Sequence, residues 1–307
     1  ILGHQRPGSM ATIAQPMAFF GSGGPVVMTL IDDLMLLFGA ALIIAWFVSS
    51  RVVTVAGAAA FLLGARHVAV YMVNENVLAL GLGVGAVAML VRHRSVGIAL
   101  VVGGALGLGV GIRPIMFSML PAALWLTVGN RARAGVLAGL LLGAAPWLVT
   151  HQTVYGDALH HPSLDVPAPE QTVLGMSVRF HPLNFPVADE LMRPKDSLLP
   201  LALSMPLEHT AAFGGLFCVF AVLGLFSLPW RRAIGWLAWG APVYGLLSLI
   251  VALDYEKQSY ALLAFAPLPV FFGAGVAALR EPPPMSRRIA ASILAAILLV
   301  GLRVVSP

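Results

Sequence analysis

The stretch "VYMVNENVLALGLG", residues 70–83, places one carboxylate, Glu75, between two asparagines at the head of a long apolar run. A charged side chain costs several kcal/mol when it is placed in hydrocarbon. The stretch therefore predicts a membrane-spanning helix that begins near Glu75, with the carboxylate at its mouth. A second interpretation needs no function, because an acid in the first turn of a helix is favoured by the helix dipole.

The composition of the chain agrees with a membrane protein. Its 307 residues are 59% hydrophobic and only 10% charged, and the mean hydropathy is +0.91. Soluble domains carry about 25% charged residues, so an ordinary soluble domain is excluded. The one cysteine, Cys218, cannot form a disulfide within the chain. We expect an all-α, polytopic transmembrane helical bundle.

The chain contains ten apolar runs that are long enough, or nearly long enough, to cross a bilayer. They are 27–49, 52–64, 68–91, 95–111, 113–128, 134–150, 210–228, 234–253, 259–279 and 286–303. A span needs ~20 residues, so 52–64 is short. We expect 68–91 to become a span only near Glu75.

This spacing predicts four parts of the chain. Residues 1–26 would end a first outer loop and include an interfacial helix that stops at Gly21. Residues 27–150 would form about six spans, 151–209 a large outer loop, and 210–307 about four spans.

Basic residues predict the orientation of these spans. Ten of the 18 lie in one set of short connections: Arg51, Arg92, Arg94, Arg131, Arg133, Arg231, Arg232, Arg280, Arg287 and Arg288. Short loops rich in Lys and Arg stay in the cytoplasm. The loop 151–209, most acids and seven of the eight histidines then face the exoplasm. The net charge of +5 is explained by topology, so no nucleic-acid partner is predicted.

Two other features have ordinary explanations. The glycine-rich run 103–111 lacks the Lys-Ser/Thr ending of a phosphate-binding loop, and small residues that let helices pack closely explain it better. His160 and His161 with Asp157 offer metal-ligand chemistry, but no third ligand has a defined spacing, and a polar surface loop is the better interpretation. We therefore expect no cofactor and no metal site, although a divalent metal stays possible in principle.

Five short motifs follow one another in a recognisable order. They are "QRPGSM" (5–10), "NENVLAL" (74–80), "GIRPIMF" (111–117), "PWLVTHQTVYGDAL" (146–159) and "QSYALLAFAPLP" (258–269). Together they resemble the polytopic GT-C glycosyltransferases of the bacterial branch related to dolichyl-phosphate-mannose and aminoarabinose transferases. The first motif lacks the second proline and the tyrosine of the family pattern, and no residue in 1–26 is acidic. The resemblance thus implies that the family's first span and the catalytic general base precede residue 1.

The resemblance implies transfer of a sugar from a polyprenyl-phosphate donor to a lipid, glycan or protein acceptor, at the exoplasmic face of a bacterial inner membrane. A lipid-phosphate leaving group needs fixed cations, and guanidinium suits phosphate. The implied cations are Arg6, Arg113 and Lys257, and Glu75 would orient the substrate. The implied substrate contacts are His151, Tyr155 and Tyr260.

Alternatives remain open for these assignments. Arg113 and Lys257 also suit cations that reach the lipid headgroups from a helix end. Asp32 and Asp33 are best explained as structural partners of Arg66 or Arg113. For the whole chain, the alternative is a non-catalytic protein, either a transporter or flippase, or a scaffold subunit of a glycan assembly complex.

Overall fold

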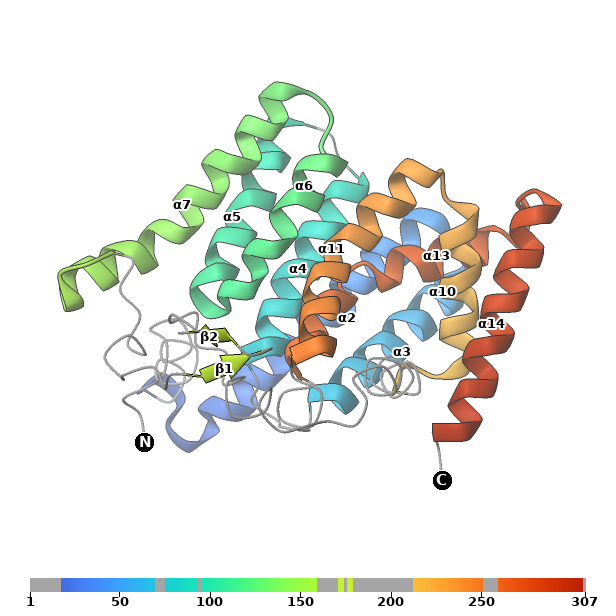
Figure 1. Ribbon diagram of the computed structural model, residues 1–307, viewed down its shortest axis with the longest axis horizontal. Helices are drawn as coiled ribbons and strands as arrows, with labels where there is room; N and C mark the ends of the chain where they lie inside the picture. Colours follow the sequence, from blue (N-terminus) through green and yellow to red (C-terminus); the bar gives the residue numbers. More distant parts are fainter. Residues whose placement is uncertain are drawn as a thin grey trace.

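The computed structural model describes residues 18–69, 75–92, 95–158, 171–173, 176–178, 212–250 and 259–305. The α-helices in these ranges are α2 (Gly24–Phe47), α3 (Arg51–Ala69), α4 (Glu75–Arg92), α5 (Val96–Ile112), α6 (Leu120–Leu126), α7 (Asn130–Tyr155), α10 (Gly215–Ser227), α11 (Trp230–Ile250), α13 (Leu268–Ala277) and α14 (Met285–Val305). The 3-10 segments are η1 (Gly21–Gly23), η2 (Pro114–Met119) and η4 (Ser259–Phe265). Figure 1 shows a helical bundle. Along the chain, η2 leads directly into α6, and two turn residues separate η4 from α13.

A helix stands at each of the ten apolar runs. In the part of the chain that the structure describes, three segments are long and apolar enough to cross a membrane: Ala18–Phe47, Arg51–Ala69 and Asn130–Thr153. The helical fold class is confirmed for the described residues. Ten spans and a large exoplasmic loop stay predictions.

The helix boundaries can be compared with those expected: α3 is longer than its apolar run, and α4 begins at Glu75, as predicted. The short run 52–64 becomes the full-length helix α3, whose last turn includes Arg66 and His67; cations are favoured at a helix C-terminus. The run 68–91 contains the end of α3 and then α4, which begins at Glu75. The helix expected to stop at Gly21 is described only over residues 18–20, and η1 then begins at Gly21 and leads into α2. Gly21 has a φ of +54°, which lets the chain turn tightly there.

Exposed arginines gather at one edge of the bundle, which we call the basic edge. They are Arg51, Arg92, Arg131, Arg133, Arg231, Arg232, Arg280, Arg287 and Arg288. In Figure 1 the α6–α7 connection lies at the top on this edge, and the end of α14 lies at the bottom on the opposite edge.

Hydrogen bonds join the connections along the basic edge. Arg280 Nη1 donates to Ser49 Oγ at 3.3 Å, which links the α13–α14 and α2–α3 connections. Arg287 Nη1 donates to the carbonyl oxygen of Leu228 at 3.4 Å, which links α14 to the end of α10. Arg133 Nε donates to the carbonyl oxygen of Leu124 at 3.2 Å. The basic connections are therefore neighbours in space.

Glycines let α5 and α7 pack almost backbone to backbone. The two helices run parallel, because Gly103 lies on Val136 and Leu140 while Gly107 lies on Leu140 and Ala144. A Cβ at either glycine would collide with a carbonyl oxygen of α7. The prediction that the glycine-rich run serves helix packing is confirmed. Gly224 of α10 and Gly275 of α13 make a second close contact of this kind.

A cluster of phenylalanines joins α3, α10 and α13. The rings of Phe217 and Phe272 stack with centroids 4.6 Å apart, and Phe61 stacks on Phe213 at 5.7 Å. Gly57 and Gly64 of α3 make room for Phe272 and Phe213. Offset-stacked and edge-on ring pairs add about 0.5–1.5 kcal/mol each beyond burial.

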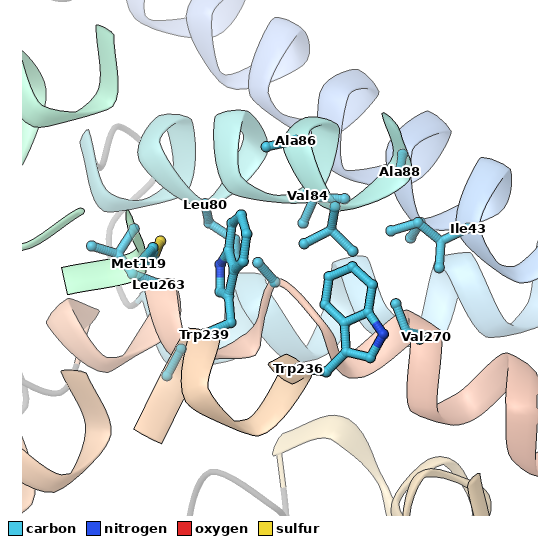
Figure 2. Packing of buried hydrophobic residues seen from close by; sticks show 14 of the residues in the cluster. Ile43, Leu80, Val84, Ala86, Ala88, Met119, Trp236, Trp239, Leu263 and Val270 are labelled. Carbon is cyan, nitrogen blue, oxygen red and sulfur yellow. The ribbon is translucent and has the colours of Figure 1, made fainter. Parts of the chain in front are cut away.

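The centre of the bundle is filled from α11. Figure 2 shows Trp239 surrounded by Leu80, Met119 and Leu263, and Trp236 beside Val84 and Val270. These residues come from α4, η2, η4 and α13 and are buried. The tryptophans therefore tie the 3-10 segments to the long helices.

Among the described residues, a short pair of strands lies in the predicted outer loop. Strands β1 (Gln171–Val173) and β2 (Met176–Val178) pair antiparallel, with Val173 opposite Met176. They lie near the lower edge in Figure 1. Two residues connect them, the length of the commonest hairpin connection.

Candidate functional site

Between the basic edge and the opposite edge of the bundle, the described part of the chain carries four charged side chains. All four lie in the half of the bundle that is farther from the basic edge. They are Asp32 and Asp33 of α2, Arg66 of α3 and Arg113 after α5. Asp32 lies eight residues into α2, about 12 Å from its start at 1.5 Å per residue. The charges thus reach into the bundle from one side.

Arg113 lies at a break in the helical chain. α5 ends at Ile112, Arg113 is extended with φ −139° and ψ 101°, and η2 begins at Pro114. A residue before proline avoids the helical region because its backbone would clash with the proline ring, so the Arg-Pro pair causes the break. Arg113 is only 9% exposed. The break therefore holds a guanidinium within the protein instead of releasing it to solvent.

An ion pair joins α2 to α3 within the charged half. Arg66 Nε lies 2.5 Å from Asp33 Oδ1, and Arg66 Nη2 donates to the carbonyl oxygen of Thr29 at 3.0 Å. The structural explanation is confirmed for Asp33 and Arg66.

The neighbouring carboxylate, Asp32, is placed differently. It is 3% exposed, and its Oδ1 has no hydrogen-bond partner among the described residues. Met35 and Gly39, on the same face of α2, lie on Gly81 and Val84 of α4. Asp32, Met35 and Gly39 are spaced i, i+3 and i+7, so they lie on the same face of α2. Asp32 therefore belongs to the face that packs on α4.

Further buried polar groups lie close to the 3-10 segments. Asn76 in the first turn of α4 is 1% exposed, and α4 packs against η4. Ser118 Oγ of η2 and Trp239 Nε1 of α11 are buried without a hydrogen-bond partner in the described part of the chain. We call Asp32, Asn76, Arg113, Ser118 and Trp239 the polar interior. Sequence reasoning missed Ser118 and Trp239, because a serine or tryptophan in an apolar helix is normally a packing residue.

The other predicted site residues fall into two groups. α4 begins at Glu75, α7 ends at Tyr155 with His151 in its last two turns, and η4 contains Tyr260. Each of these four residues lies at the end of its element that is remote from the basic edge, because α4 ends at Arg92 and α7 begins before Arg131 on that edge, and the chain after η4 leads through α13 to Arg280 there. Arg6 and Lys257, and the possible metal ligands His160 and His161, lie outside the described residues.

The end of α7 extends beyond α5. Trp147 packs on Gly111, next to the last residue of α5, so the eight residues 148–155 continue about 12 Å further. Trp147 Nε1 donates to the carbonyl oxygen of Leu108 at 3.1 Å, so this indole joins α5 to α7. The helix then stops at Gly156, whose φ of 75° is the left-handed conformation of a C-terminal cap.

Two other features carry no site chemistry. A shallow hollow between α4, α5 and α6 is lined by Leu90, Ser95, Ile98, Ala99, Leu126, Thr127 and Val128. It lies at the basic edge, away from the polar interior. Within the described ranges, no three His, Cys, Asp or Glu side chains stand together as metal ligands would.

Comparison with known proteins adds no relative: no family model, curated protein or solved structure matches the chain. The function therefore has to be argued from the residues and their placement.

Proposed function

We propose that the protein is a membrane glycosyltransferase that moves a sugar from a polyprenyl-phosphate donor to a lipid, glycan or protein acceptor. The observation that carries this proposal is the buried Arg113 at the break between α5 and η2. An arginine held in a low-dielectric surrounding binds the phosphate oxygens more strongly than one in water. It would stabilise the negative charge that grows on the lipid phosphate as the sugar leaves.

The placement of the other predicted residues supports a site near Arg113. Glu75 opens α4, His151 and Tyr155 lie in the last two turns of α7, and Tyr260 opens η4. These helix ends share one edge of the bundle. In the proposed reaction the acceptor hydroxyl loses its proton to a carboxylate base, and the sugar carbon exchanges its bond to phosphate oxygen for one to the acceptor oxygen.

The one-sided distribution of charge favours this enzyme over a transporter or flippase. A route through the membrane needs polar groups along its length. The described helices have no charged side chain between the basic edge and the level of Asp32 and Arg113. An access route from one face, with the basic edge in the cytoplasm and the site at the exoplasmic face of a bacterial inner membrane, agrees better with this pattern.

A transfer assay on membranes that contain the protein as the cell produces it tests the proposal. Polyprenyl-phosphate sugars are supplied as a panel, and the wild type is compared with Arg113→Ala and Arg113→Lys. We expect Arg113→Ala to reduce transfer at least about a hundredfold, the usual cost of removing one transition-state donor, and Arg113→Lys to retain part of it. Arg92→Ala, an exposed cation at the basic edge, should leave transfer unchanged.

Two results separate the alternatives. Transfer that is unimpaired in Arg113→Ala refutes the phosphate role of this residue. If the wild type transfers no sugar from any donor, the scaffold interpretation gains support.

A further inference from the structure

A corner of the basic edge combines two arginines with two exposed tryptophans. Trp230, Arg231 and Arg232 form the beginning of α11, and Trp125 ends α6 beside them. The side chains of Trp125 and Trp230 are 53% and 60% exposed. We call these four residues the Trp–Arg corner.

The corner is held in place by its own contacts. Trp125 Nε1 donates to the carbonyl oxygen of Arg231 at 3.1 Å. Gly235 lies one turn further along α11, where a Cβ would meet Trp125 and Leu126 at under 3 Å. The guanidinium carbon of Arg231 lies 5.8 Å from the centroid of the Trp230 ring. The ring of Trp125 is thus exposed but held in place, and the ring of Trp230 lies beside the guanidinium of Arg231.

No acidic side chain among the described residues forms a salt bridge with the two arginines of this corner. Arg231 and Arg232 lie in the first turn of α11, which holds no acidic residue. The helix dipole is positive at that end, so the arginines add to a potential of the same sign. Among the described connections of the basic edge the only acid is Glu281, which is exposed in the α13–α14 connection. An anion from outside the chain would offset this charge.

We propose that the Trp–Arg corner binds the headgroup of an anionic phospholipid. The phosphate would lie against Arg231 and Arg232, and the tryptophan rings would lie at the level of the glycerol and upper acyl chains, where amphipathic rings are favoured. The indole N–H of Trp125 is already used within the protein, so its ring offers mainly an apolar face. Charge, aromatic rings and position beside apolar helices favour a lipid over an acidic protein segment. This inference does not depend on the proposed transfer reaction.

Native mass spectrometry of the detergent-purified protein tests the proposal. Phosphatidylglycerol, phosphatidylcholine or inorganic phosphate is added, and bound molecules are counted for the wild type and for Arg231→Gln/Arg232→Gln. Each basic residue near an anionic surface contributes about a fivefold change in affinity. We expect the double variant to bind phosphatidylglycerol at least tenfold more weakly, with phosphatidylcholine bound weakly by both proteins.

The matched control is Arg51→Gln/Arg92→Gln, which removes the same charge elsewhere on the basic edge. It should bind phosphatidylglycerol like the wild type. An equal loss in both double variants would mean that the whole edge attracts lipid without a site at the corner, and overturns the proposal. Equal binding of phosphatidylcholine, or saturation by inorganic phosphate alone, overturns it as well.

A second variant protects the test against misfolding. Trp230→Leu keeps both arginines and removes one exposed ring, and size-exclusion chromatography reports whether each variant is folded. We expect Trp230→Leu to weaken phosphatidylglycerol binding several-fold. Wild-type binding in both Trp230→Leu and Arg231→Gln/Arg232→Gln overturns the proposal.

Discussion

Asp33 of α2 and Arg66 of α3 form an ion pair of 2.5 Å inside the half of the bundle that carries the other buried charges. Their side chains are 31% and 18% exposed, so the pair is only partly screened by solvent. Arg66 also binds the carbonyl oxygen of Thr29. The pair therefore fixes the register of α3 against the first three turns of α2.

Replacing Asp33 by Asn should destabilise the protein. Breaking a buried pair costs about 3–5 kcal/mol, because the partner charge stays buried, and breaking a surface pair costs at most ~1 kcal/mol. For this half-buried pair we expect about 1–3 kcal/mol and a lower midpoint of thermal unfolding in detergent.

A double-mutant cycle supplies the control for this pair. If the two side chains act through each other, Asp33→Asn/Arg66→Gln will be less destabilised than the sum of the single variants. Strict additivity would show that the ion pair does not couple α2 to α3.

Replacing Asp32 by a leucine should change the midpoint of thermal unfolding in the opposite direction to Asp33→Asn. Its buried Oδ1 has no hydrogen-bond partner in the described part of the protein, and such an oxygen costs about 1–3 kcal/mol. We expect Asp32→Leu to raise the thermal midpoint, because a leucine of similar length suits the stripe that packs on α4. If Asp32→Leu lowers the thermal midpoint as much as Asp33→Asn does, the buried Asp32 carboxylate is not a source of instability.

Glycines at the α5–α7 contact should tolerate no side chain. A Cβ at Gly103 or Gly139 would collide with the carbonyl oxygen of Val136 or Leu100. Both atoms belong to backbone, so only a shift of the whole helix relieves the collision. We expect Gly103→Ala and Gly139→Ala to cost about 1–3 kcal/mol each, as overpacking usually does, with a lower thermal midpoint.

Gly97 offers the matched control on the same helix. A Cβ there meets nothing within 4 Å, and alanine is a better helix former than glycine by about 1 kcal/mol. Gly97→Ala should leave the midpoint unchanged or raise it. If Gly103→Ala and Gly97→Ala behave alike, the close α5–α7 contact is wrong.

Short patterns in the sequence predicted the positions of most of the helices and of one break between them. Apolar runs placed the helices, because a helix that is apolar all round is buried or in a membrane. The Arg113–Pro114 pair placed the break before η2, because proline acts on its neighbour directly. The apolar run 52–64 ends before Arg66, whereas α3 continues to Ala69. The partner of Arg66, Asp33, is 33 positions away in the sequence, so the adjacent residues do not reveal that Arg66 is held within the bundle.

The features that escaped prediction depend on contacts between distant segments. Trp147 and Trp239 are tryptophans in apolar helices, yet one joins α5 to α7 and the other fills the centre of the bundle. Nothing in the adjacent sequence separates these two cases from the exposed Trp125, which also stands among apolar residues. The hairpin at 171–178 did have a weak local signal, a glycine at 175 with Thr172 and Val173 before it and Val178 after it.

Cysteine labelling in intact cells tests the orientation of the bundle. In a Cys218→Ser background, Thr153→Cys places a thiol near the end of α7, and Arg131→Cys places one near its start. Both positions are exposed, and α7 is one of the helices long and apolar enough to cross a membrane. Because the basic edge should face the cytoplasm, a membrane-impermeant maleimide should label the first variant in intact cells and the second only after permeabilisation. The reverse pattern would place the polar interior toward the cytoplasm, and labelling of both variants from outside would mean that α7 does not cross the membrane.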